Sequence, residues 1–256
     1  MEVSTHVDTL RMEGSRLAAA ATLAGANAPV PSCPDWSVRE LVIHQGSVHR
    51  WATAYVAEGH TEAGAVDFAT ARGPEPDDAE LVDWFVRGHA GLVDALSEAS
   101  PDVQCWSFLP APSPLAFWAR RQAHETSIHR VDAELAGGQP RSAISSDFAA
   151  DGIDELLVGF GTVRGRALKP DEVTAVIDVQ CTDEDATWSM RLGPERDVPT
   201  ATRGAADDVG AAKTVCTVRG TAADLYLVLW RRNGPDALDV EGDPDPFELA
   251  LERVRI

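Results

Sequence analysis

The feature that most constrains the fold is a change in the spacing of hydrophobic residues near residue 141. Before this point, hydrophobic residues recur with the period of an α-helix. After it, several short segments alternate between hydrophobic and polar residues, as half-buried strands do. A chain of 256 residues is long enough for two domains, each with a core of its own. The sequence therefore predicts an α+β protein, with a helical domain at residues 1–140 and a smaller α/β domain at residues 141–256.

Capping residues mark the ends of the helices predicted in the first domain. Ser37 and Glu40 have the spacing of a capping box, and Trp36 can pack on Leu41 across the first turn. Ser113 precedes a proline, which is favoured at the first position of a helix, and a Gly-Gly pair follows the last turn. The four helices are expected at residues 5–25, from 37 to about 59, from 77 to about 96, and from 113 to about 137. Helices joined by short connections indicate a four-helix bundle.

The second domain is expected to mix strands and helices. Strands are predicted at residues 172–180, 187–192, 213–218 and 238–240. Helices are predicted at residues 146–159, 222–230 and 246–253. Residues 204–210, which are rich in Gly and Asp, are expected to form a loop.

The balance of charge excludes some classes of partner. The chain carries 22 basic and 41 acidic residues, which gives a formal net charge of −19. Such a surface repels nucleic acid and disfavours docking on anionic lipid. No apolar run approaches the roughly 18 residues that a membrane helix needs, and the first residues lack the features of a secretory signal. We therefore expect a soluble, cytoplasmic protein that binds neither nucleic acid nor membranes.

The cysteines give no sign of a disulfide or of a cysteine-ligated metal. They lie far apart in the sequence, and no two of them form a C-x-x-C pair, which excludes a zinc ribbon. We expect free thiols that pack as small hydrophobic residues, at Cys33, Cys105, Cys181 and Cys216.

One histidine of the second helix is a candidate metal ligand. His44 shares a helical stripe with apolar residues such as Leu41, Val48 and Trp51, so it is expected to face the interior of the bundle. His49 is rotated by about 140° from His44 and is expected to face elsewhere. A single inward-facing histidine is more often a core residue than a ligand, so a metal site needs further donors.

The fourth helix supplies such donors. Glu125 and His129 are four residues apart, so both project from one face of the helix, one turn apart. With a third ligand from a neighbouring helix they would hold one ion and leave a position open, as catalytic zinc sites do. The alternative is a surface ion pair between these two side chains, and spacing alone leaves both interpretations open. Asp132, one turn further, either orients a ligand or faces water.

The other histidines are weaker candidates. His89 lies on an apolar stripe of the third helix, and it is an alternative third ligand that we expect to be a core residue. His124 and His129 are five residues apart, whereas a zincin motif requires four, so His124 is expected to be a neighbour rather than a ligand. His6 and His60 are expected near the terminus and in a loop.

Two arginines, Arg231 and Arg232, end the helix predicted at residues 222–230. Basic residues are favoured at helix C-termini by the helix dipole. An alternative is that the pair binds an anionic group beside the candidate metal site. On the residues alone, the dipole explanation is the better one.

Three segments resemble the actinobacterial maleylpyruvate isomerase family. The first is Cys33-Pro-Asp-Trp-Ser-Val-Arg-Glu-Leu-Val-Ile-His44, and the second is Trp118-Ala-Arg-Arg-Gln-Ala-His-Glu-Thr-Ser-Ile-His-Arg-Val-Asp-Ala-Glu134. The third is the run from Gly220 to Arg232. The resemblance therefore covers nearly the whole chain.

This resemblance implies a DinB-like four-helix bundle joined to a C-terminal α/β domain. It implies a divalent ion, usually zinc, on His44, Glu125 and His129, and mycothiol as the thiol cofactor with its sulfur on the open metal position. It also implies that Arg232 acts near the substrate, although Arg231 stands where the family usually has glycine.

A metal-bound thiol would define the chemistry. A cation beside a thiol lowers its pKa and yields a thiolate at neutral pH. The expected function is therefore that of a mycothiol-dependent metalloenzyme acting on a small electrophile, either as a maleylpyruvate-type cis–trans isomerase or as an S-transferase. The alternative is a non-catalytic, metal-stabilised protein that binds a small molecule.

Overall fold

The structure, a computed structural model, describes the chain apart from residues 167, 170, 195–197, 205–212 and 255–256. Residues 205–210 of the predicted loop lie outside the described residues. The chain divides into two compact units, residues 1–142 and residues 143–256. The first unit is helical and the second contains a β-sheet, so the predicted α+β class is confirmed.

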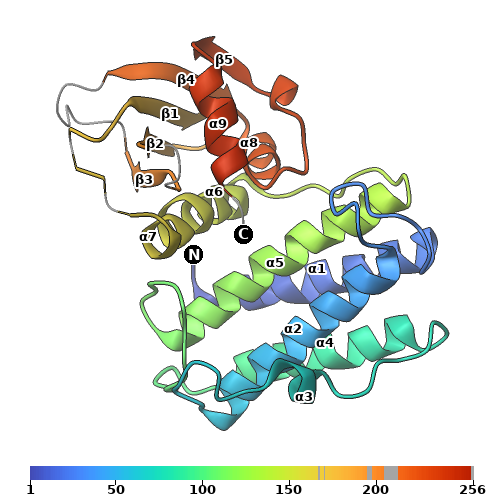
Figure 1. Ribbon diagram of the computed structural model, residues 1–256. Coiled ribbons are helices and arrows are strands. Elements are labelled where there is room, and N and C mark those ends of the chain that lie inside the picture. The colour runs from blue at the N-terminus through green and yellow to red at the C-terminus, as the bar shows by residue number, and fades with distance from the viewer. Residues whose placement is uncertain (167, 170, 195–197, 205–212, 255–256) are drawn as a thin grey trace. The chain divides into compact units, whose positions relative to one another are not determined.

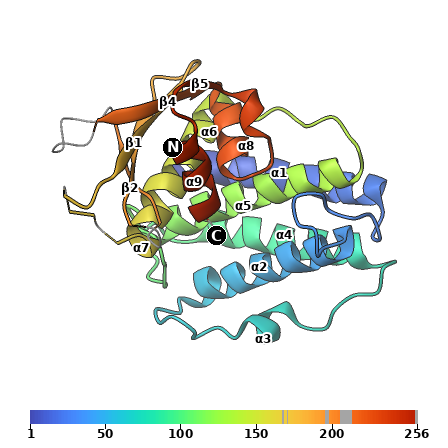
Figure 2. The ribbon, with the colours of Figure 1, turned by 45° about the horizontal axis from the view of Figure 1, so that its top comes forward.

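The first unit is a bundle of four long helices (Figure 1). Helix α1 (Val3–Ala24) packs mainly against α5 (Pro114–Ala136), and α2 (Val38–Glu58) packs mainly against α4 (Leu81–Glu98). The short helix α3 (Phe68–Arg72) lies beside α2 in both ribbon views (Figures 1 and 2). This helix was not predicted, because five residues are too few to show a helical period.

Local capping explains where α2 and α5 begin. The capping box between Ser37 and Glu40 is present, and the backbone N–H of Ser37 donates to Glu40 Oε2 at 2.8 Å. The side chain of Ser113 accepts a hydrogen bond from the backbone N–H of Ala116 at the start of α5. The prediction for α4 was wrong at its start: Asp77 begins a turn with i→i+3 hydrogen bonds, and the α-helix begins only at Leu81.

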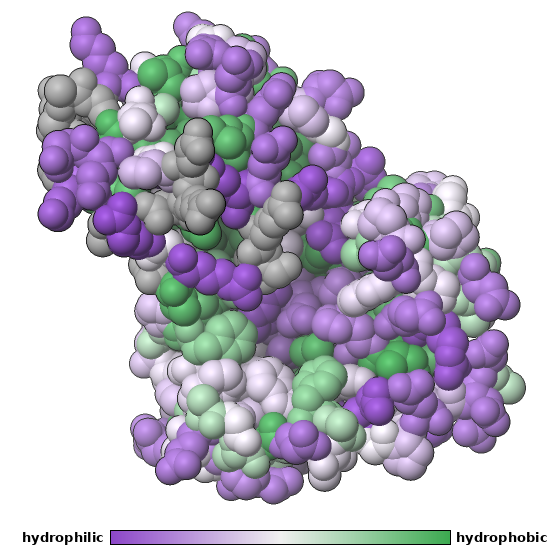
Figure 3. Space-filling view, in the orientation of Figure 1, coloured by the Kyte–Doolittle hydropathy of each residue, from purple (hydrophilic) through white to green (hydrophobic). Residues whose placement is uncertain are grey.

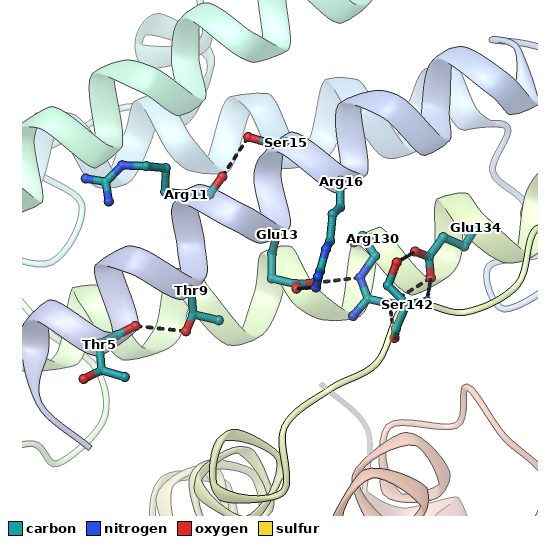
Figure 4. Close-up of polar contacts among 9 residues, drawn as sticks. All are labelled: Thr5, Thr9, Arg11, Glu13, Ser15, Arg16, Arg130, Glu134 and Ser142. Atoms are coloured by element: carbon teal, nitrogen blue, oxygen red, sulfur yellow. Dashed lines mark hydrogen bonds and ion pairs between the residues drawn. The ribbon is translucent and has the colours of Figure 1, made fainter.

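A buried ionic network joins α1 to α5 (Figure 4). The side chain of Arg130 is fully buried; its Nε donates to Glu13 Oε2 at 2.7 Å and its Nη1 donates to Glu134 Oε2 at 2.8 Å. Burial lowers the pKa of Arg130, but the two carboxylates outweigh it and the pKa is raised overall. The hydroxyl of Ser142 donates to Glu134 Oε1 at 2.6 Å, so the same network holds the last residue of the unit.

The second unit contains a five-stranded sheet of order β3-β2-β1-β4-β5. Strands β1 and β4 pair in parallel, and the other neighbours are antiparallel. The strands are β1 (Ala175–Cys181), β2 (Thr187–Leu192), β3 (Thr200–Arg203), β4 (Thr214–Gly220) and β5 (Asp239–Gly242). Four of them were predicted. Strand β3 was missed because it has only four residues, none of them buried, and so gives no alternation.

Helices pack beside this sheet. Helix α6 (Ser146–Asp154) continues through a π-helical segment (Glu155–Phe160) into α7 (Gly161–Arg164), which extends the helix predicted at residues 146–159. The prediction of a helix after Thr221 is confirmed by α8 (Ala222–Leu229), which packs against α6 and β4. Helix α9 (Asp245–Arg253) contacts β1 and β4 (Figure 2).

The surface is largely hydrophilic on the face that Figure 3 shows, and the four cysteines, all among the described residues, form no disulfide, as the sequence predicts. On the face seen in Figure 3, hydrophilic residues predominate in both units, and hydrophobic residues form small groups. In the part of the chain that the structure describes, no helix is both long enough and apolar enough to cross a membrane. The predicted free thiols are confirmed for all four cysteines; two are buried, whereas Cys33 and Cys181 are only half-buried.

Candidate metal centre

Three donor side chains meet between α2 and α5. His44 comes from α2, and Glu125 and His129 come from α5; one ligand atom of each lies within 4.8 Å of the others. His44 Nε2 lies 3.5 Å from Glu125 Oε1, and the imidazole rings of His44 and His129 are 5.2 Å apart at 75°. The structure thus brings together the three residues that the sequence picked out, one from a helix about 80 positions earlier in the chain.

The three donors differ in exposure, which leaves one side of the cluster accessible. The side chains of His44 and Glu125 are 34% and 21% exposed, whereas that of His129 is 11% exposed. His44 was expected to face the bundle interior, but it lies at the edge of the α2–α5 contact. An ion held by these donors would therefore keep a coordination position open towards solvent or a ligand.

Asp132 orients the buried histidine. Its Oδ2 lies 2.9 Å from His129 Nδ1, and the hydroxyl of Ser32 donates to its Oδ1. A proton held on Nδ1 by this carboxylate leaves the Nε2 lone pair of His129 available to a cation. The sequence left two readings of Asp132, and the structure shows a fully buried side chain that contacts a candidate ligand. Ser32 was not anticipated, since 100 residues separate it from Asp132.

The protonation states suit metal binding. Burial raises the pKa of Glu125, but a hydrogen bond from His44 and the nearby charge of Arg121 outweigh it and lower the pKa to about 2. The Nε of Arg121 lies 3.5 Å from Glu125 Oε2. Burial lowers the pKa of His129 despite the opposing effect of Asp132. A carboxylate and a neutral imidazole are the forms that bind a divalent cation.

Trp36 forms an aromatic wall beside the donors. Its ring lies 4.9 Å from that of His44 and 6.0 Å from that of His129. The segment before α2 that carries Trp36 closes on itself, because Val30 N–H donates to Trp36 O and Trp36 N–H donates to Cys33 O. From the sequence, Trp36 was expected to pack against the first turn of α2, with pocket lining as a weaker alternative.

Two further histidines belong to the core of the bundle. His49 is fully buried: its Nε2 lies 2.9 Å from Thr126 Oγ1, and its ring lies 5.2 Å from that of His89. His89 stacks on Phe85 with ring centroids 5.9 Å apart, so the expectation of a core residue is confirmed. Helix α2 packs against both α4 and α5, and this explains why His49 is buried although it points away from His44.

The remaining histidines lie outside the cluster. His124 is buried, with its ring 6.0 Å from that of His6. His6 lies near the terminus as expected, in the first turns of α1, and its side chain is buried. His60 follows α2 and pairs with Glu58 at 2.9 Å.

The second unit holds the two arginines singled out by the sequence. Arg231 has φ = +61°, a left-handed conformation. Its N–H bonds to Val228 O while the N–H of Arg232 bonds to Leu227 O, which is a Schellman motif at the end of α8. This backbone position favours glycine, which accounts for the glycine usual there in the family that the sequence resembles. Arg232 Nη1 donates to Trp230 O at 2.8 Å.

Three of the chain's four cysteines are poor nucleophiles, because burial raises the pKa of their thiols. Burial raises the pKa of Cys105 and of Cys216, and with nearby carboxylates it raises the pKa of Cys181 to about 11. Only a thiolate attacks an electrophile efficiently. The raised pKa therefore disfavours a nucleophilic role for these three cysteines.

Comparisons with known proteins match both parts of the chain to one family. The family described as "Mycothiol maleylpyruvate isomerase N-terminal domain" matches residues 7–134, and the "MDMPI C-terminal domain" matches residues 147–248. A comparison with curated proteins found no match.

Solved structures show the same fold. A crystal structure of the mycothiol-dependent maleylpyruvate isomerase is 14% identical, covers 95% of both chains and gives a TM-score of 0.62. A histidine-to-alanine mutant of that isomerase gives a TM-score of 0.61 at the same identity and coverage. The two matched domains take in both compact units, and so the resemblance seen in the sequence is confirmed: the chain belongs to the mycothiol maleylpyruvate isomerase family.

Proposed function

We propose that the protein is a mycothiol-dependent metalloenzyme whose divalent ion, zinc in the first instance, is held by His44, Glu125 and His129. The observation that carries the proposal is the convergence of these donors within 4.8 Å, with one histidine oriented by a buried carboxylate. Two imidazoles and one carboxylate form a donor set that zinc accepts, with one position left for a further ligand.

The residues around the donors have defined tasks in this proposal. Asp132 holds the proton on His129 Nδ1, and Arg121 keeps Glu125 ionised. Bound there, a divalent ion supplies a Lewis acid that lowers the pKa of a thiol at the open position, the chemistry that thiol-dependent isomerisation and S-transfer share. Trp36 flanks His44 and excludes water from one side of the cluster.

Three further parts of the proposal concern the reaction partners. The thiol is mycothiol, as in the names of the matched family and of the solved relatives. The second partner is a small electrophile, converted by cis–trans isomerisation or by S-transfer, and Arg232 contacts an anionic group of it. Four free cysteines suit the reducing cytoplasm, where we place the reaction.

Metal content is the decisive test. After reconstitution with zinc, wild-type protein should bind about one ion per chain, as sites with three protein ligands and one open position do. His44→Ala and Glu125→Ala should lose it, whereas His60→Ala, which removes a histidine outside the cluster, should retain it. Wild-type protein that takes up no metal, or variants that bind it normally, would overturn the proposal.

A second function is favoured by one observation: the donors come from two helices, so an ion could serve to tie α2 to α5. In that non-catalytic protein, removing the metal would lower the melting temperature. Titrating the cobalt-loaded protein with mycothiol would then leave the absorption spectrum unchanged. In the enzyme, thiol binding changes the spectrum because the sulfur enters the coordination sphere.

A further inference from the structure

A polar groove lies on a different side of α2 from the candidate metal centre. It has a volume of about 390 Å³ and is formed by α2, α3 and α4. His44 and Arg50 are six residues apart on α2, so their side chains point about 120° apart around the helix axis. The groove and the metal donors are therefore separate features. Its lining includes Arg50, Thr53, Ala57, Ala71, Arg87 and Gly91.

One arginine of this groove is held rigidly. Arg50 Nη1 donates to Gly46 O at 2.8 Å, and its Nη2 donates to Trp84 O at 2.6 Å. The guanidinium carbon lies 3.8 Å from the centroid of the Trp84 ring. Gly88 makes room for this arrangement, because a Cβ there would lie 2.2 Å from Arg50 Nη1. A guanidinium fixed in this way needs little further ordering to bind a ligand.

The second arginine brings another positive charge to the same groove. Burial and the charge of Arg87 together lower the pKa of Arg50 to about 10. Within the described residues, neither guanidinium has an ion pair with a carboxylate. Glu58 also lines the groove, but its carboxylate accepts a hydrogen bond from His60 at 2.9 Å. The groove therefore has two arginines and one carboxylate, so its lining is net positive in a chain with a formal charge of −19.

We propose that this groove binds the oxyanion group of a small molecule, a phosphate or a carboxylate, between Arg50 and Arg87. An anion placed there relieves the repulsion between the two guanidiniums and forms charge-assisted hydrogen bonds with them. The small residues Ala57, Ala71 and Gly91 leave an apolar space for the rest of the ligand. A Cβ on Gly91 would meet no atom within 4 Å, which shows that this part of the groove is open.

Two variants test the charge and the space separately. Arg87→Ala removes one guanidinium that is exposed and makes no ion pair, so it should leave the fold intact. Gly91→Leu keeps both arginines and fills the open part of the groove. Arg11→Ala is the matched control, because it removes one exposed positive charge of the same bundle whose partner is Asp8 of its own helix.

The experiment is isothermal titration of the full chain with inorganic phosphate and, separately, with succinate, at constant ionic strength set by sodium chloride. Wild-type protein and Arg11→Ala should bind one of these anions saturably. Arg87→Ala should bind it at least about tenfold more weakly, since a charge-assisted hydrogen bond is lost. Gly91→Leu should weaken succinate, which has a carbon chain, more than phosphate. The anion that binds with the higher affinity identifies the ligand's acidic group as a phosphate or a carboxylate.

Two results would overturn the proposal. One is wild-type protein that binds neither anion beyond the effect of chloride. The other is a binding affinity in Arg87→Ala that does not differ from that of wild type, or that is weakened no more than in Arg11→Ala. Either finding would show that the groove does not hold the anion. Circular dichroism of each variant establishes that the helices are intact.

Discussion

His129 and Asp132 lie one turn apart on α5, and His129 Nδ1 is 2.9 Å from Asp132 Oδ2. Because this contact fixes which ring nitrogen carries the proton, it sets the direction of the lone pair on the other nitrogen. Asp132→Asn should therefore weaken zinc binding by roughly 10- to 100-fold, the usual effect of losing a hydrogen-bonded partner of a metal ligand. Competition with a chromogenic chelator measures this affinity.

A matched control separates charge from contact in this experiment. Asp83→Asn removes one exposed carboxylate from α4, outside the donor cluster, and should leave zinc affinity unchanged. If Asp132→Asn bound zinc as tightly as Asp83→Asn, the orienting role of Asp132 would be wrong.

Burial of His49 predicts a loss of stability in mild acid. Its pKa in the folded protein lies well below 6.5 because burial disfavours the charged form. Below pH 6.5 the unfolded chain binds a proton that the folded chain does not, so the free energy of unfolding falls as the pH falls. The fall should be about 1.4 kcal/mol per pH unit for this histidine, and above pH 6.5 its contribution is fully present.

Urea unfolding at pH 7.5, 6.0 and 5.0, with chelator present throughout, measures this slope. His49→Gln should be less stable than wild type at pH 7.5 but should lose less stability on acidification. His60→Gln, at a half-exposed position, should show the wild-type slope. Parallel curves for wild type and His49→Gln would show that His49 does not carry the acid sensitivity.

The ionic network around Arg130 predicts a large cost for breaking it. Arg130→Met would leave the buried Glu134 without this cation and would leave Glu13 with Arg16 alone, whose Nη1 lies 2.7 Å from Glu13 Oε1. Removing one partner of a buried ion pair costs about 3–5 kcal/mol. Arg11→Met, which breaks an exposed pair with Asp8, should cost less than about 1 kcal/mol. Equal losses in the two variants, measured by urea unfolding, would contradict the prediction.

The left-handed backbone at Arg231 predicts a stabilising substitution. Arg231→Gly removes the Cβ that is disfavoured at φ = +61° and should raise the free energy of unfolding by up to about 1 kcal/mol. Arg231→Ala keeps the Cβ and should give no such gain. Thermal unfolding of both variants checks this, and an equal change in the two would show that the backbone conformation is not the cause.

Sequence reasoning was most successful where structure depends on near neighbours. Ser37 and Ser113 begin their helices as predicted, since an N-cap acts within three residues. The start of α4 was misplaced because several acidic residues before Leu81 could each serve as the cap, and packing selected among them. Strand β3 is held by its pairing with β2, which no local pattern reveals.

In the candidate site, too, local relations could be predicted from the sequence and tertiary contacts could not. The relation of Glu125 to His129 follows from helical spacing alone. His44 was a candidate from its place on an apolar stripe, but the residues alone left His89 as an alternative third ligand, because the contact between α2 and α5 is a tertiary one. Ser32 lies 100 residues from Asp132, so no spacing rule could join them. Trp36 precedes α2, so the helical period that places His44 does not extend to it. His6 was set aside because of its place near the terminus, which says nothing of the burial that packing gives it.

The self-closed segment before α2 has a consequence for engineering. Its ends are tied by the hydrogen bond between Val30 N–H and Trp36 O, and it carries both Ser32 and Trp36 to the donor cluster. Residues 30–36 therefore form a unit that can be replaced as a whole by the corresponding peptide of a relative. Such a graft would alter the side chains beside the donor cluster while leaving His44, Glu125 and His129 on their helices.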